Sequence, residues 1–143
     1  MTVLAQIASG FSGLILLTLS LLHFYWVFGG SLGKTKTIPA DPQGKLAFVP
    51  GKAVTALVGI LLFTAALCPL CMRVENVLSI PKNVFQYGCY FLSLIFFLRA
   101  VGDFKFVGFF KKIKTTIFAQ YDTRFYSPLC VFLSFLLFLS ACS

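Results

Sequence analysis

The chain has 143 residues, of which 59% are hydrophobic and 11% are charged, and its formal net charge is +8. An ordinary soluble domain carries roughly a quarter charged residues, so this composition favours a membrane protein over a soluble one. The basic residues border apolar segments and lie among aromatic residues, so the expected partners are membrane lipids with anionic headgroups, and no nucleic acid.

Four apolar runs are long enough to cross a bilayer, which takes about 20 residues (range 17 to 25). Lipid offers no hydrogen-bond partners to the backbone, so such runs are expected to be helices. The predicted fold is all-α: an integral membrane, antiparallel four-transmembrane-helix bundle that forms a single membrane domain over residues 1–143. The four predicted spans are 7–28, 53–72, 84–102 and 126–142.

The basic residues predict an orientation, because Lys and Arg accumulate in short cytoplasmic loops. The loop between the first two spans and the loop between the last two are therefore expected in the cytoplasm, with both termini outside. The N-terminal "MTVLAQIASG" lacks the basic region of a cleavable signal, so the first helix should be retained. The cytoplasmic loops would hold Lys34, Lys36, Lys45, Lys52, Lys105, Lys111, Lys112, Lys114 and Arg124, against Arg73 and Lys82 in the outer loop.

The first span ends in "LHFYWVFGG", which contains His23, Tyr25 and Trp26. Trp and Tyr favour headgroup depth, which is sufficient reason for Tyr25 and Trp26 to lie there. An ionisable group at membrane depth usually faces the bundle interior or a cavity. Two interpretations of His23 stay open: a neutral imidazole bonded to a neighbouring helix, or a residue that binds a ligand or handles a proton.

The second span ends in "CPLC", whose spacing suggests redox chemistry. Reactive pairs of this kind gain thiolate stability at a helix N-terminus, whereas these cysteines lie at a C-terminus, where the helix dipole opposes the thiolate. Three alternatives remain: a structural disulfide among the outer cysteines, reduced and inert thiols, or thiol–disulfide exchange through Cys68 and Cys71. The disulfide candidates are Cys68, Cys71, Cys89 and Cys142.

The third span ends with Arg99, and Asp103 follows at i+4 on the same helix face. An unpaired buried arginine would be costly, so an Arg99–Asp103 pair or a snorkelling side chain is expected. The alternative is that the guanidinium of Arg99 binds an anionic headgroup or substrate in a two-point fashion.

Residues 105–118 predict a short amphipathic interfacial helix between the third and fourth spans. Their aromatic and aliphatic side chains recur at helical spacing, and the lysines occupy the remaining arc, which is typical of a helix in the membrane plane. The apolar stripe is Phe106, Phe109, Phe110, Ile113 and Ile117, and the lysines expected to face headgroups are Lys105, Lys111, Lys112 and Lys114.

The segment "YDTRFYSP" precedes the fourth span. Asp122 can cap a helix or pair with Arg124, and Pro128 suits the first turn of a helix. Asp122, Arg124 and Tyr126 are therefore candidate ligand-binding residues together with Arg99 and Asp103, although a network that only locks the loop to the helices would be simpler.

The segments "LHFYWVFGG" and "RAVGDFKFVGFFKKIKTTIFAQYDTRFYSPLC" resemble a family of small four-helix bacterial membrane proteins of unknown function. The resemblance implies a bacterial plasma-membrane location and a shared set of inner-face residues, but no reaction. The "CPLC" segment is not part of that pattern. The pattern comprises His23, Trp26, Gly29, Gly30, Arg99, Gly102, Asp103, Gly108, Asp122, Tyr126, Pro128, Leu129 and Cys130.

Three functional hypotheses follow. The preferred one is a non-enzymatic protein that binds an anionic lipid, a small amphipathic ligand or a partner helix at an inner-leaflet site. The second is an enzyme acting on a lipid or quinone-like substrate, and the third is a small transporter or complex subunit. For the third, Ser9 and Gly13 offer a small-residue surface for a homodimer. Neither a metal site nor a cofactor is expected, because His23 has no second ligand in its own helix.

Overall fold

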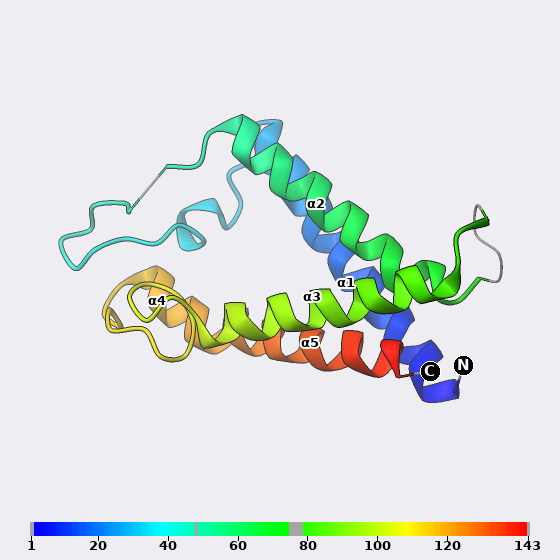
Figure 1. Ribbon diagram of the computed structural model, residues 1–143. Coiled ribbons are helices and arrows are strands. Elements are labelled where there is room, and N and C mark those ends of the chain that lie inside the picture. Colours follow the sequence, from blue (N-terminus) through cyan, green and yellow to red (C-terminus); the bar gives the residue numbers. More distant parts are fainter. Residues whose placement is uncertain (1, 48, 75–78, 143) are drawn as a thin grey trace.

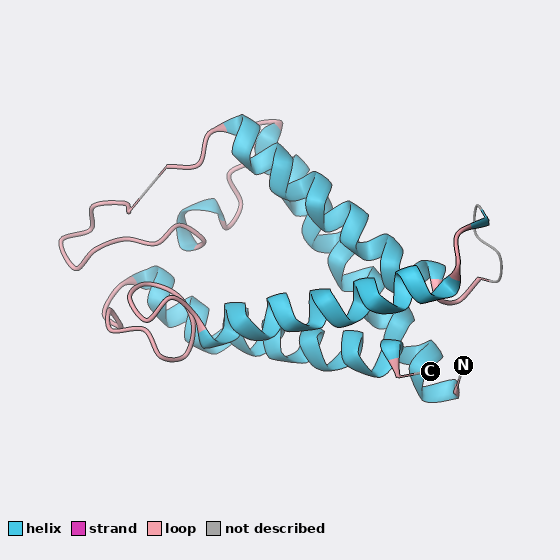
Figure 2. Ribbon diagram, in the orientation of Figure 1, coloured by secondary structure: helices cyan, strands magenta, loops and turns pink. Residues whose placement is uncertain are grey.

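The computed structural model describes residues 2–47, 49–74 and 79–142, and these residues are mainly helical (Figure 1). Four helical segments are long and apolar enough to cross a membrane: α1 (Val3–Val27), α2 (Lys52–Cys71), α3 (Lys82–Val101) and a composite segment over Ile117–Ala141. The described residues contain no β-strand, only an isolated bridge between Ala40 and Leu46 (Figure 2). The chain is thus all-helical, with the four apolar helices that its hydropathy predicts.

The fourth helical segment is interrupted by a π-helical turn. It consists of α4 (Ile117–Tyr121), the π turn η3 (Asp122–Tyr126) and α5 (Ser127–Ala141). The hydroxyl of Thr116 accepts a hydrogen bond from the amide of Ala119 at 3.2 Å and so caps α4. Helical structure therefore begins well before the expected start at residue 126. The amide of Ser127 donates to the carbonyl of Asp122, five residues back, which is the π pattern.

The interfacial helix expected over 105–118 is not formed, and residues 102–116 make an irregular loop instead. Gly102 and Gly108 have φ values of 93° and 89°, and Phe104 has a φ of 62°, all incompatible with a right-handed helix. The carboxylate of Asp103 also accepts three backbone amides that a helix would need for its own ladder. The helical spacing of the phenylalanines could not reveal that Asp103 competes with a helix for these backbone amides.

The four long helices associate as two pairs. α1 packs along α2, and α3 packs along α5. Figure 1 shows the two pairs crossing near the end where both chain termini lie and diverging toward the end that carries residues 28–51 and 102–116. The buried apolar core lies along the contact of the pairs and includes Leu16, Ala66, Met72, Cys89, Leu133, Leu137 and Ala141. The second end is called the loop end below.

Small and hydroxyl residues let the helices approach one another closely. Ser93 and Ser134 each donate to the other's carbonyl at 2.8 Å between α3 and α5, and Ser20 donates to the carbonyl of Gly59 at 2.8 Å between α1 and α2. Ser9 is fully buried and Gly13 lies against Leu70. The small-residue surface proposed for a homodimer is therefore used inside the chain itself.

Candidate functional site

Asp122 is the centre of a buried charge network at the loop end. Its carboxylate is fully buried and accepts three hydrogen bonds, one from Nη2 of Arg99 at 3.0 Å, one from Nζ of Lys111 at 3.0 Å and one from the amide of Gly108 at 2.8 Å. The network joins α3, the 102–116 loop and η3. Charge-assisted hydrogen bonds of this kind are stronger than neutral ones, so Asp122 fixes the loop to the helices.

Lys111 is buried rather than directed to the membrane surface, which corrects the expectation for this lysine. Only 2% of the residue is exposed. Its ammonium group donates to the carbonyl of Gly108 at 2.8 Å, to the hydroxyl of Thr123 at 2.7 Å and to Asp122. These bonds use all three of its donors. Lys111 lies among other lysines in the sequence, so composition could not single it out.

Arg99 does not pair with Asp103, because its ionic partner is Asp122. Asp103 instead accepts the amides of Lys105, Phe106 and Val107 at 2.7 to 2.9 Å. Partial burial opposes ionisation, but the backbone amides outweigh it and hold the pKa of the Asp103 carboxyl below its usual range. The expected i+4 pair is wrong because the helix ends at Val101, so Asp103 does not continue the helical face of Arg99.

Lys36 links the first loop to the fourth helical segment. It belongs to a short 3₁₀ turn, η1 (Lys34–Lys36), and its ammonium donates to the hydroxyl of Tyr121 at 3.0 Å while lying 4.9 Å from the centre of that ring. The hydroxyl of Tyr126 donates to the carbonyl of Lys36 at 3.4 Å. The bond to Tyr121 raises the pKa of the Lys36 ammonium. Tyr126 thus contacts the first loop.

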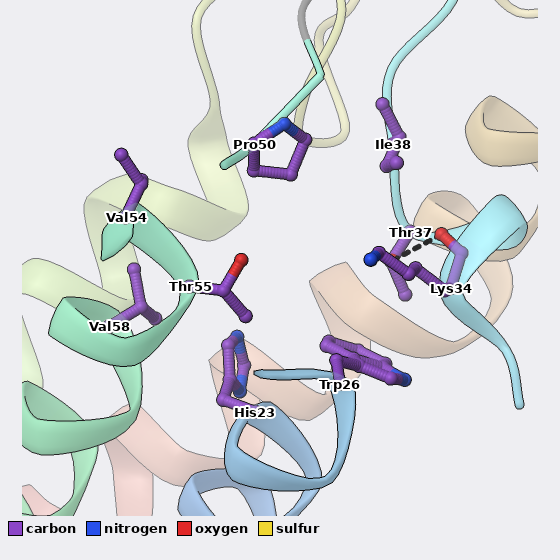
Figure 3. A pocket seen from close by; sticks show the side chains of 9 residues that line it. All are labelled: His23, Trp26, Lys34, Thr37, Ile38, Pro50, Val54, Thr55 and Val58. Atoms are coloured by element: carbon purple, nitrogen blue, oxygen red, sulfur yellow. Dashed lines mark hydrogen bonds between the residues drawn. The ribbon is translucent and has the colours of Figure 1, made fainter. Parts of the chain in front are cut away.

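His23 lies in a different place, in a cavity of about 200 Å³ between α1, α2 and the first loop (Figure 3). We call this cavity the His23 pocket. Its walls are mostly apolar, and His23, Lys34 and two threonine hydroxyls supply the polar groups. Figure 3 shows the Lys34 side chain extending into the space beside Trp26. The lining residues are His23, Trp26, Lys34, Thr37, Ile38, Pro50, Val54, Thr55 and Val58.

Backbone hydrogen bonds orient the two rings of the His23 pocket. Nδ1 of His23 lies 2.7 Å from the carbonyl of Leu19, which can only accept, so Nδ1 carries the hydrogen and Nε2 is left for a ligand. Nε1 of Trp26 donates to the carbonyl of Leu32 at 2.9 Å, and the two rings meet edge to face with centroids 5.0 Å apart. The site residues Lys34, Thr37 and Thr55 were missed by sequence reasoning, since nothing in their local pattern marks them.

The predicted site residues do not all line the His23 pocket. The lining of the His23 pocket includes His23 and Trp26 but none of Arg99, Asp103 and Asp122. Tyr25 is 46% exposed and its ring lies against Gly30. Arg124 is exposed. The loop end thus holds a structural charge network and, apart from it, an apolar pocket with few polar groups.

All five cysteines are free thiols: Cys68, Cys71, Cys89, Cys130 and Cys142. Cys68 lies close to α3, since a side chain on Gly88 would come within 2.9 Å of its sulfur. The structure thus contains none of the disulfides considered from the sequence. Within the described parts of the chain, no group of three or more His, Cys, Asp or Glu side chains could hold a metal ion.

The cations of the loop end outnumber the acids that could neutralise them. Asp41 accepts the amides of Gln43 and Lys45, and Asp103 and Asp122 are engaged as described above. In the described ranges both ion pairs use Asp122, with Arg99 and Lys111. The basic residues of the loop end that are left without a described carboxylate partner are Lys34, Lys36, Lys45, Lys52, Lys105, Lys112, Lys114 and Arg124.

Comparisons with known proteins identify a family but no activity. No curated protein and no solved structure matches the chain. The pattern of one family does match, and it covers residues 16–137, which include the His23 pocket and the Asp122 network. The chain therefore belongs to a family of proteins of unknown function, DUF3995.

Proposed function

We propose that this membrane protein binds the anionic headgroup of an amphipathic molecule in the His23 pocket, with the apolar part of that molecule in the surrounding lipid. The observation that carries the proposal is a mostly apolar cavity in which the Lys34 ammonium can bind an anion and Nε2 of His23 can accept a hydrogen bond from a headgroup hydroxyl. Ligand sites in proteins commonly combine apolar walls with a few convergent polar groups.

The size of the His23 pocket favours a headgroup over a whole lipid. Its volume is about 200 Å³, whereas pockets that enclose a drug-sized ligand measure roughly 300 to 1,000 Å³. A phosphate-bearing or carboxylate-bearing headgroup would fill such a space, and its chains would extend out of the pocket toward the bilayer.

Charge favours an anion as the occupant. Lys34 has no described carboxylate partner, and it belongs to a loop end with an excess of unpaired lysines. The lysine-rich loops also favour an orientation with residues 28–51 and 102–116 in the cytoplasm and both termini outside, in a bacterial plasma membrane. Anionic lipids of the inner leaflet would then be the nearest source of such headgroups.

Trp26 provides a direct test, because it is the single tryptophan of the chain and lines the His23 pocket. Short-chain dihexanoyl phosphatidylglycerol, added to the protein in a neutral detergent, should change the Trp26 emission in a saturable way. The K34Q variant should weaken this binding by about tenfold, as expected for a hydrogen bond to a charged group.

A matched control is K45Q, which removes a lysine of the same loop that does not line the His23 pocket. K45Q should bind as the native chain does, and H23A should bind more weakly. Equal emission changes in the native chain and K34Q, or a loss of the same size in K45Q, would contradict specific binding in the pocket.

A further inference from the structure

Arg73 lies against the surface of α1 at the end of the molecule opposite the His23 pocket. Its Nη1 donates to the carbonyl of Gln6 at 3.2 Å. The guanidinium group lies directly over Gly10, where the first carbon of a side chain would collide with Nη1. A glycine at this position is therefore what allows the guanidinium to rest on the helix backbone.

An apolar groove of about 340 Å³ lies beside this guanidinium on α1. Its walls include Ile7, Phe11 and Leu14, which recur at i, i+4 and i+7 and so share one face of the helix. Each of these side chains is more than half exposed, so the groove is open to whatever surrounds α1. The guanidinium of Arg73 thus borders an apolar groove on α1, a helix that is long enough to span a membrane.

We propose that this groove is a second binding site, which takes an anionic phospholipid with its phosphate on Arg73 and an acyl chain along Ile7, Phe11 and Leu14. Arginine has five N–H donors in a planar fork, and one protein acceptor is described for Arg73. The remaining donors match two oxygens of a phosphate group. The described carboxylates of Asp41, Asp103 and Asp122 are engaged elsewhere, at the loop end.

The contact with Gln6 distinguishes this site from an ordinary arginine at a membrane surface. A free arginine side chain must give up rotamer freedom to bind a headgroup, which lowers its affinity for that headgroup. The guanidinium of Arg73 is already held over Gly10, so less of that freedom remains to be lost on binding. The site is independent of the His23 pocket, because the two share no lining residue.

Native mass spectrometry of the detergent-purified full chain with added phosphatidylglycerol tests the proposal. The measurement is made in the K34Q background, which weakens the phosphatidylglycerol site proposed in the His23 pocket. In that background the affinity of the first bound lipid should fall by about tenfold on adding R73Q, as expected for loss of a charged hydrogen-bond donor, and should stay unchanged on adding K82Q. Lys82 is the matched control, because it is an exposed cation at the same end of the molecule. Equal affinity with and without R73Q in that background would overturn the proposal.

The G10A variant tests whether the position of the guanidinium over Gly10 matters, without removing its charge. Since the colliding atoms belong to the end of a flexible side chain, Arg73 should move away and α1 should stay folded. A phosphatidylglycerol with a photoreactive acyl chain should label residues 7–14 in the native chain, and this labelling should fall in G10A and R73Q. Labelling that is unchanged in both variants would exclude the groove as the binding site.

Glu75 follows Arg73 closely in the sequence and lies outside the described residues. The native mass spectrometry measurement is therefore repeated in an E75Q background, which removes this carboxylate. R73Q should lower phosphatidylglycerol binding in that background as well. A phosphatidylcholine control should show less binding than phosphatidylglycerol in the native chain, and equal binding of the two lipids would contradict selection of an anionic headgroup.

Discussion

At the scale of single residues, Asp122 is one carboxylate that serves two cations. It balances only one of the positive charges of Arg99 and Lys111, and it is fully buried. Removing one member of a buried ion pair leaves an uncompensated charge, which typically costs about 3 to 5 kcal/mol. The network is therefore expected to dominate the local stability of the loop end.

The D122N variant should be less stable than the native chain by about 3 kcal/mol or more, because Lys111 keeps a buried charge without its counter-ion. Unfolding by denaturant in detergent micelles, followed by circular dichroism, measures the difference. D41N is the control: the Asp41 oxygen that accepts two backbone amides is replaced by an amide oxygen that can also accept them, so the loss should be much smaller. Adding K111M to D122N should recover part of the lost stability, and a further loss would contradict the argument.

Asp103 predicts a stability change in acid. Since its folded pKa lies below the ordinary value of about 3.9, its carboxylate contributes stability above that value, and the contribution disappears as the pH falls through the lowered folded pKa. The stability difference between the native chain and D103N should therefore be largest near pH 6 and should shrink below about pH 4. Denaturant unfolding at several pH values checks this, and a difference that grows in acid would contradict it.

At the scale of elements, the 102–116 loop is held by hydrogen bonds instead of by regular helix. Asp103 gathers the amides of three following residues, and Gly108 fits against the end of α3. Exposed phenylalanines, Phe104 and Phe110, lie on the outside of this loop with their rings 6.4 Å apart. The loop is thus an ordered element that presents aromatic and basic side chains outward.

The G108A variant should disturb this loop, because a side chain at Gly108 would collide with the backbone of Val101 and Gly102. G44A is a matched control: Gly44 has a similar φ of 82°, but no atom lies near its added carbon. G44A should cost only about 1 kcal/mol of backbone strain, and G108A clearly more. Hydrogen exchange should show faster amide exchange at residues 102–116 in G108A, and equal effects in the two variants would be inconsistent with close packing at Gly108.

The π turn η3 has a positional role among the elements. It inserts one extra residue between α4 and α5, and Asp122 begins it. π turns of this kind frequently occur at functional sites. At this turn the Asp122 carboxylate points toward α3 and the 102–116 loop, and Tyr126 contacts the first loop.

At the scale of the whole molecule, the two helix pairs cross at one end and diverge at the other (Figure 1). Near the loop end, η1 contacts α4, and Lys36 makes the bond to Tyr121. This connection lies next to the His23 pocket, since Lys34 of η1 and the adjacent Thr37 line that pocket. Movement of the first loop would therefore alter the pocket.

The Y121F variant should loosen the first loop, because it removes the hydroxyl that accepts from Lys36 and keeps the ring. An exposed contact of this kind is worth about 0 to 1 kcal/mol, so global stability should hardly change. Hydrogen exchange should nevertheless become faster at residues 34–37. Y87F, which removes a hydroxyl from an exposed tyrosine on α3, is the control and should leave those amides unaffected.

The sequence by itself determined that the chain is all-helical with four apolar helices, because long apolar runs leave the backbone no alternative to internal hydrogen bonding. It also indicated the charged segments that meet at the loop end. Arg99 and Asp122 could be named as candidates since ionisable residues are rare in such a chain.

Only the tertiary structure decided which of these residues pair. Asp103 was adjacent to Arg99 on a helical wheel, yet the helix ends at Val101 and Asp122 takes its place. Lys111 resembles its neighbours in sequence, but its ammonium is buried and bonded to Gly108 and, on the next helical segment, to Asp122 and Thr123. The His23 pocket and the position of Arg73 over Gly10 depend on segments that are distant in sequence. Such contacts are set by packing between elements, whereas hydropathy and spacing report only on the element that contains the residue.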